Sequence, residues 1–129
     1  MADRRYGRGM DVRREVLGDE HVARAEARKS ELDREFQELI TETAWGSVWA
    51  RPGLERRERS LLTIALLAAL GHKDELAMHI RATRNTGASR DDVKEALLHV
   101  AVYAGVPAAN AAFEVARRVY EEEADGGTR

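Results

Sequence analysis

Residues 61–70 read LLTIALLAAL, an apolar run whose one polar residue is Thr63. On a helix this run is apolar on every side, and such a helix lies either at the centre of a fold or in an interface between subunits. The run has ten residues, whereas a helix needs about 20 to cross a bilayer. We therefore expect a helix that opens near Glu55, ends at Gly71 and belongs to the core or to a subunit interface.

The rest of the chain also predicts helices and no sheet. No stretch alternates apolar and polar residues with a period of two, and β-branched and aromatic residues are sparse. Helices are expected over residues 11–17, 19–29, 30–49, 55–70, 72–85, 89–104 and 107–124. The expected stops between them are Gly18, Gly71, Gly87 and Gly105. The predicted fold class is all-α, with one domain over residues 1–124 and a disordered tail over residues 125–129.

Two of these helices carry a cap pattern at their start. Ser30 is followed three residues later by Asp33, and Ser89 by Asp92, a spacing that approximates a capping box. Behind the first cap, four apolar residues share one helix face: Leu32, Phe36, Leu39 and Ile40. Such a stripe is typical of a helix that packs its apolar face against other elements.

Length, charge and composition restrict the class of protein. The chain has 129 residues and a formal net charge of −2, which fits one domain and argues against nucleic-acid binding. No apolar segment follows the basic N-terminus, so we expect a cytoplasmic protein without a membrane partner. Aromatic residues make up only 5% of the chain and alanines bury little area each, so a homo-oligomer is expected. Cysteine is absent, which excludes thiolate nucleophiles and Cys-ligated metals.

The most suggestive group of chemically active residues is His72, Glu75 and His79. Offsets of three and seven residues place them within about 60° of one another on a helix. Two imidazoles and a carboxylate on one face are compatible with a metal site or with an acid–base pair. A plain surface pair between Glu75 and His79 also fits the spacing, and His72, next to Gly71, lies at the expected helix start.

Two further groups have the chemistry to contact a ligand. Trp45 and Trp49 are four residues apart and share a helix face. They form either a packed pair or a flat apolar wall for a planar ring. Arg56, Arg57 and Arg59 gather near a helix start, where they form either a solvated charged turn or a clamp for a carboxylate.

Six short segments of the chain form a recognisable set. They are GMDVRREVLG at 9–18, WGSVW at 45–49, RERSL at 57–61, DELAMHIRA at 74–82, NTGAS at 85–89 and VYAGVPAAN at 102–110. The set resembles the carboxymuconolactone decarboxylase family, and the similarity runs from about Tyr6 to Tyr120. A peroxidase-like branch of that family has Cys-x-x-Cys-x-x-x-His where this chain has His72, Glu75 and His79. Because both thiols are missing here, the resemblance implies the decarboxylase branch.

The resemblance implies an all-α subunit that assembles into a ring, as a trimer or a hexamer. It implies decarboxylation of 4-carboxymuconolactone, a lactone dicarboxylate of protocatechuate breakdown, to β-ketoadipate enol-lactone, with no cofactor and no metal. Three alternatives stay open: a different lactone or keto acid as substrate, a metal-assisted lyase, and a non-catalytic helical oligomer.

The resemblance also gives each group of residues a role. His79 is the expected proton donor, because a histidine ordinarily titrates near neutral pH. Glu75, one turn earlier, is expected to orient the imidazole or keep it charged. The tryptophans are expected to wall the ring and an arginine to hold a carboxylate. The expected substrate-binding residues are Trp45, Trp49, Arg57 and Arg59.

Overall fold

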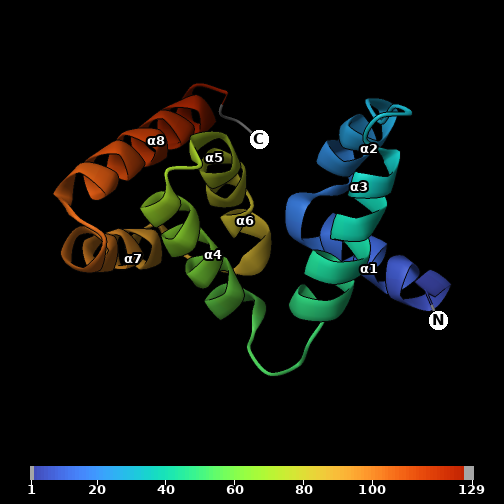
Figure 1. Cartoon of the computed structure of the whole chain (residues 1–129). Helices are drawn as coiled ribbons and strands as arrows, with labels where there is room; N and C mark the ends of the chain where they lie inside the picture. Colours follow the sequence, from blue (N-terminus) through green and yellow to red (C-terminus); the bar gives the residue numbers. More distant parts are fainter. Residues whose placement is uncertain (1, 127–129) are drawn as a thin grey trace. The chain divides into compact units, whose positions relative to one another are not determined.

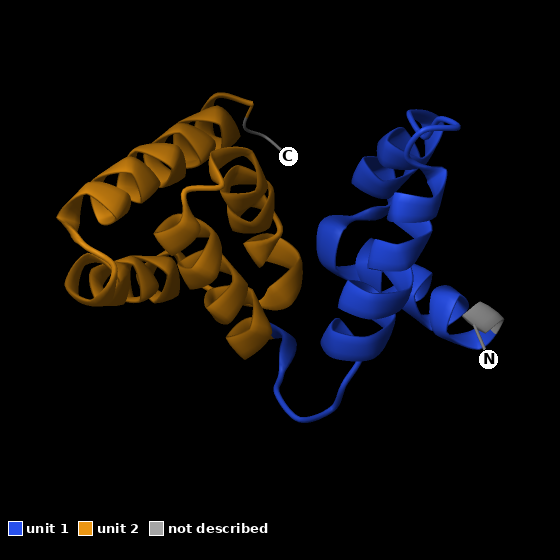
Figure 2. Cartoon of the chain, viewed as in Figure 1, with its two compact units in different colours: residues 1–56 blue, residues 57–129 orange. Residues whose placement is uncertain are grey.

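The computed structural model describes residues 2–126, which form helices joined by short turns (Figure 1). The helices are α1 (Ala2–Leu17), α2 (Asp19–Ala27), α3 (Arg34–Ile40), η1 (Thr41–Trp49), α4 (Arg56–Leu70), α5 (Lys73–Arg81), α6 (Thr83–Thr86), α7 (Arg90–Tyr103) and α8 (Val106–Asp125). No strand occurs in residues 2–126, so the predicted all-α class is confirmed. The chain divides into two compact units, residues 1–56 (unit 1) and 57–129 (unit 2), coloured separately in Figure 2.

The helix ends fall at the predicted glycines. Within the described part of the chain, the residues with positive φ are Gly18, Gly71, Gly87 and Gly105, at 97°, 79°, 88° and 110°. Residues with a Cβ atom rarely adopt this conformation, so glycine ends a helix at little cost. After the last of these stops, Pro107 lies in the first turn of α8, where its missing N–H has no helical partner to lose.

Unit 1 is built around a close crossing of α1 and η1. A Cβ atom on Gly9 would lie 2.1 Å from the carbonyl oxygen of Thr41, and one on Gly46 would lie 2.5 Å from the carbonyl oxygen of Arg5. Neither position has room for a side chain, so both glycines are needed for this backbone approach. The crossing also explains why α1 is longer than the predicted segment over residues 11–17, because tertiary packing outweighs local propensity.

The helix predicted over residues 30–49 forms as two different helices, and it starts later than expected. The backbone N–H of Ser30 donates to Oδ1 of Asp33 at 2.8 Å, but the residues between them form a turn, and α3 begins only at Arg34. From Thr41 to Trp49 the chain is a π-helix. The side chain of Ser47 follows this wider spacing, since its Oγ donates to the carbonyl oxygen of Glu42 at 3.0 Å.

The apolar stripe of α3 does not pack into a core of this chain. Leu32 is 93% exposed, and Phe36 and Leu39 are 59% and 57% exposed. Only Ile40 is partly covered. Helix α3 has no buried residue, so most of this stripe is exposed apolar surface.

Unit 2 has an apolar core of large and small side chains. Its fully buried large members are Ile64 of α4, Leu76 and Ile80 of α5, and Leu97 of α7. Alanines of α8, such as Ala112 and Ala116, complete it. Small residues allow helices to approach closely, so α8 packs against both α5 and α7.

Helix α4 buries one face and exposes the other. Ile64 and Ala68 are buried, whereas Leu62, Leu66 and Leu70 are 54%, 61% and 68% exposed. Helix α4 therefore contributes its buried face to the core of unit 2 and leaves its other apolar face exposed.

The segment between Gly71 and Ser89 contains two helices where one was predicted. Helix α5 ends at Arg81, and the four-residue α6 follows after Ala82. Ser89 then caps α7 with a complete capping box, in which its Oγ accepts from the backbone N–H of Asp92 at 3.0 Å. At the other end of the chain, α8 includes Asp125, the first residue of the predicted tail. Residues 127–129 of that tail lie outside the described residues.

Candidate functional site

His79 lies in the last turn of α5 and is 6% exposed. The adjacent helix positions Leu76 and Ile80 are fully buried in the core of unit 2, so the backbone that carries the imidazole is firmly held. An imidazole on such a helix is pre-positioned, which a proton-transfer group requires. His79 is therefore not part of a surface pair, one of the interpretations that its spacing allowed.

Glu75 lies one helical turn before His79 and is exposed. Positions four apart share a helix face. The predicted role of Glu75 as an orienting group rests on this helix geometry. Its carboxylate also lies in the first turn of α5, where it interacts favourably with the helix dipole.

His72 lies outside the helix that carries His79. It is the N-cap residue of α5, with φ −88° and ψ 82°, as its place after Gly71 indicated. Among residues 2–126, no three His, Asp or Glu side chains are close enough together to hold a metal ion.

Trp45 and Trp49 form a pair on the π-helix η1 of unit 1. Their ring centroids are 5.1 Å apart and the ring planes are inclined by 32°. The two residues are 6% and 7% exposed. The predicted shared face is confirmed, and the sequence pattern missed the π-helix that sets the angle between the rings. Wide helical turns of this kind are rare and are frequently found at functional sites.

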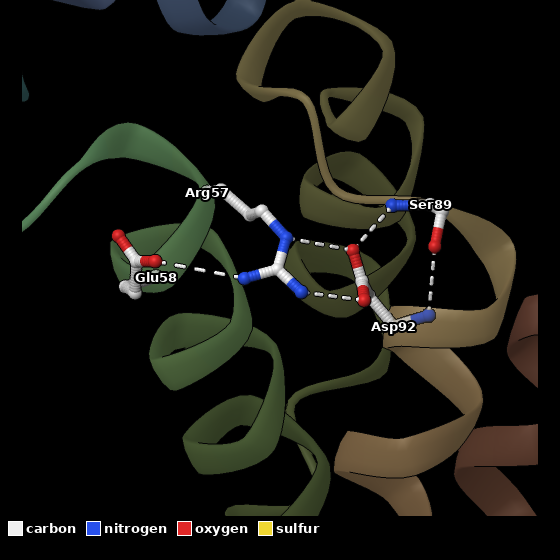
Figure 3. A network of polar contacts seen from close by, with 4 residues as sticks. All are labelled: Arg57, Glu58, Ser89 and Asp92. Carbon is white, nitrogen blue, oxygen red and sulfur yellow. Dashed lines mark hydrogen bonds and ion pairs between the residues drawn. The ribbon is translucent and has the colours of Figure 1, made fainter.

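Arg57, at the start of α4, already holds a carboxylate. Its Nε and Nη2 atoms donate to Oδ2 and Oδ1 of Asp92 at 2.9 Å and 2.6 Å, and Oε2 of Glu58 lies 3.5 Å from Nη1 (Figure 3). Asp92 is the same residue that closes the capping box of α7 with Ser89. The ion pair therefore fastens the start of α4 to the start of α7.

The electrostatic effect of this network is large. The hydrogen bonds from Arg57, and next the backbone N–H of Ser89, lower the pKa of Asp92 to about 2. A carboxylate so strongly favoured in its charged form keeps its arginine partner throughout the physiological pH range. The sequence showed Asp92 only as part of a cap, because its arginine partner lies 35 residues away and no local pattern connects them.

The other two arginines of the cluster have different surroundings. Arg59 is half-buried on α4, where its carbonyl oxygen accepts a hydrogen bond from Oγ1 of Thr63 at 2.8 Å. Arg56 belongs to unit 1, and its Nη2 lies 3.0 Å from Oε1 of Glu15.

The candidate residues are thus divided between the units. The tryptophan pair belongs to unit 1, and the predicted catalytic residues and both predicted carboxylate-binding arginines belong to unit 2. Of the helices within residues 2–126, none is both long and apolar enough to span a membrane.

Comparison with known proteins identifies the class to which this fold and these residues belong. The model of the carboxymuconolactone decarboxylase family matches residues 34–118, a range that contains the tryptophan pair, the arginines and His79. The chain belongs to this family, as the six short segments indicated.

Two relatives of similar length are decarboxylases. The chain is 49% identical over 120 residues to the 4-carboxymuconolactone decarboxylase of Acinetobacter baylyi, covering 93% of this chain and 90% of the relative. It is 42% identical over 124 residues to the nitrosuccinic acid decarboxylase of Metarhizium robertsii, covering 96% and 87%. A shorter match of 42 residues, at 52% identity, links it to a 4-carboxymuconolactone decarboxylase of Pseudomonas putida, covering 33% of this chain and 88% of that sequence.

Proposed function

We propose that this protein decarboxylates 4-carboxymuconolactone to β-ketoadipate enol-lactone, a step in the breakdown of protocatechuate, without a cofactor. The observation that carries the proposal is the 49% identity to the Acinetobacter enzyme across 93% of this chain. The absence of cysteine supports it, because peroxidase chemistry of the thiol type has no nucleophile here.

The substrate itself provides the electron acceptor for this reaction. The carboxylate that leaves is attached to the ring carbon next to a carbon–carbon double bond, and this double bond is conjugated with the lactone carbonyl. When the bond between the carboxylate and this ring carbon breaks, its electron pair moves through the double bond onto the carbonyl oxygen and forms a dienolate. Carbon dioxide departs, and a proton added to the ring carbon beside the lactone carbonyl gives the enol-lactone. The protein must therefore bind the anion, stabilise the oxyanion and deliver a proton.

His79 is the proposed proton donor. Its buried place on a helix held by the unit 2 core supports this role, since proton transfer depends on fixed geometry. A positioned acid of this kind contributes about 10²–10⁴-fold to the rate. Glu75 is proposed to keep the imidazole charged from the preceding turn, across the shared face of α5.

The proposed binding residues are of two kinds, aromatic residues for the ring and cationic residues for the carboxylate. Trp45 and Trp49 are proposed to contact the planar unsaturated ring through their indole faces. Arg57 and Arg59 are the proposed partners for the carboxylate that remains on the product. For Arg57, this contact would require the side chain to give up its two hydrogen bonds to Asp92.

A second candidate substrate is nitrosuccinic acid, favoured by the 42% identity to the Metarhizium enzyme over 96% of this chain. A nitro group accepts an electron pair as a conjugated carbonyl does, so the same binding and protonation steps would operate. The two substrates differ in shape, since one is a ring and the other an open chain. The tryptophan wall favours the ring.

We further propose that the protein is a ring-shaped homo-oligomer in the cytoplasm, a trimer or a hexamer. The support is a set of apolar side chains that are more than half exposed. In unit 1 they are Leu32, Phe36 and Leu39, and on α4 they are Leu62, Leu66 and Leu70. Large exposed apolar side chains gathered on one helix are typical of protein interfaces.

The decisive experiment is a substrate assay with the purified full chain. Loss of the absorbance of 4-carboxymuconolactone should coincide with release of one carbon dioxide per lactone, and EDTA should leave the rate unchanged. Faster turnover of nitrosuccinic acid than of the lactone would favour the second candidate function, decarboxylation of nitrosuccinic acid. Loss of activity with EDTA, restored by a divalent metal, would establish a metal-assisted lyase instead.

A further inference from the structure

A cavity in unit 2 contains none of the residues assigned to the decarboxylation. It lies between the first half of α7 and the second half of α8 and has a volume of about 190 Å³. Its apolar lining consists of Val93, Leu97, Phe113 and Ala116. Pockets for drug-sized ligands usually measure about 300–1,000 Å³, so this cavity suits a smaller molecule, about the size of a single substituted ring.

The charged residues that line the cavity are all cations: Arg90, Lys94 and Arg117. Their acidic partners do not line it. Arg90 lies 3.6 Å from Glu123, Lys94 lies 3.6 Å from Asp91, and Arg117 pairs with Glu114. The three cationic side chains are 64%, 55% and 59% exposed. Ion pairs this exposed are weak and are easily exchanged for a bound anion.

Tyr120 adds a hydrogen-bond donor to this lining. Its hydroxyl oxygen is buried and makes no hydrogen bond within the described residues. Burial raises the pKa of the phenol, so the group stays a neutral donor at physiological pH. The guanidinium of Arg90 lies over the same ring, 4.1 Å from its centroid, and this cation–π contact holds one charge beside the cavity.

We propose that this cavity binds a small aromatic carboxylate at a site separate from the decarboxylation. The apolar floor and the face of Phe113 take the ring. The cationic lining takes the carboxylate, and the hydroxyl of Tyr120 donates a hydrogen bond to it. Charge complementarity selects an anion, and the apolar floor selects a ring over inorganic phosphate.

Benzoate is the probe for this site, and benzyl alcohol is the matched neutral ring. The full-length protein, methyl-labelled at valine, leucine and isoleucine, is titrated with each compound up to about 10 mM, the range of weak affinity. Benzoate should shift the methyl signals of Val93 and Leu97 and leave Ile64 unchanged, and benzyl alcohol should shift them far less. Shifts confined to Leu76 and Ile80, beside His79, would instead place benzoate at the proposed catalytic residues and overturn the proposal.

Variants test whether the lining residues account for binding. The double variant Lys94→Gln and Arg117→Gln should weaken benzoate binding about tenfold or more, and Tyr120→Phe should weaken it without altering the fold. Arg84→Gln, a change at an exposed arginine of α6, is the matched control and should bind normally. Equal weakening in the control would refute a specific site. So would shifts of Val93 and Leu97 on dilution without benzoate, because a second copy of the chain would then fill the cavity.

Discussion

Arg57 and Asp92 are joined by two parallel hydrogen bonds of 2.9 Å and 2.6 Å, between residues 35 positions apart in the chain. Asp92 simultaneously accepts from the backbone N–H of Ser89 at 2.9 Å. One carboxylate thus completes a helix cap and fixes the neighbouring helix. Since α4 also carries Arg59, this pair sets the direction in which that proposed carboxylate-binding residue is presented.

Acid should weaken the fold through Asp92. Its pKa falls from 3.8 to about 2 in the folded chain. A lowered pKa means that the stabilisation is complete above the unfolded value and is lost as the pH falls toward 2. We expect the Tm difference between the wild type and Asp92→Asn to be constant from pH 7 to pH 5 and to shrink between pH 4 and pH 2. Thermal unfolding followed by circular dichroism measures it, and a difference independent of pH would contradict the assignment.

Removal of His79 should abolish most activity without unfolding the protein. His79→Ala should lower kcat at least about 100-fold, because a positioned acid contributes that much or more. His99→Ala, at an exposed histidine of α7, is the control and should keep its rate. Steady-state kinetics with circular dichroism of both variants decides the matter. A well-folded His79→Ala enzyme with a near-normal kcat would exclude the residue as the proton donor.

The two arginines of α4 should differ in what they affect. Arg59→Ala should raise KM about tenfold or more, through loss of a charge-assisted contact to the substrate carboxylate. Arg57→Ala should lower Tm, because it breaks the contact with Asp92, and its KM should change less. Kinetics and thermal melts of both variants make the comparison. A larger rise in KM for Arg57→Ala than for Arg59→Ala would indicate that Arg57 contacts the substrate carboxylate.

The helix crossing of unit 1 predicts opposite effects for two neighbouring glycines. Gly9→Ala should destabilise the fold by about 2 kcal/mol or more, because its Cβ atom would collide with the carbonyl oxygen of Thr41. Gly7→Ala meets nothing within 4 Å on the same helix, and alanine there should stabilise by about 1 kcal/mol. Denaturant titration of the two variants gives both values. Equal changes in the free energy of unfolding for the two variants would mean that α1 and η1 do not approach as closely as the crossing requires.

The exposed leucines of α4 should control assembly. Leu66→Glu should reduce the oligomer to a smaller species, because a charge at an apolar interface stays without a partner. Leu54→Glu, at an exposed leucine outside the helix, is the control and should leave the mass unchanged. Size-exclusion chromatography with light scattering gives the masses. A monomeric wild type would remove the basis of this proposal.

Local patterns in the sequence predicted the parts of the fold that depend on local chemistry. The four glycine stops and the capping box at Ser89 are confirmed, because a positive φ or a short hydrogen bond depends on adjacent residues. The length of α1 and the late start of α3 were not predicted. The length of α1 depends on its packing against η1, for which a helical period carries no information. The late start of α3 follows from the local turn that Ser30 and Asp33 close.

The candidate site shows the same division. The spacing of Trp45 and Trp49 predicted a shared face correctly, but the π-helix has no signature in residues 41–49 that distinguishes it from an α-helix. The cluster of arginines was found from its composition. The structural contact of Arg57 depends on Asp92, which only the folded chain brings close to it.

The π-helix between Thr41 and Trp49 also leaves room for a change in chain length. A π turn holds one residue more than an α turn, so deletion of a single residue there is absorbed when the coil tightens into an α turn. The turns on either side of the deletion then keep their register. Length variation between Trp45 and Trp49 therefore changes the spacing of the two indoles without rotating the neighbouring turns.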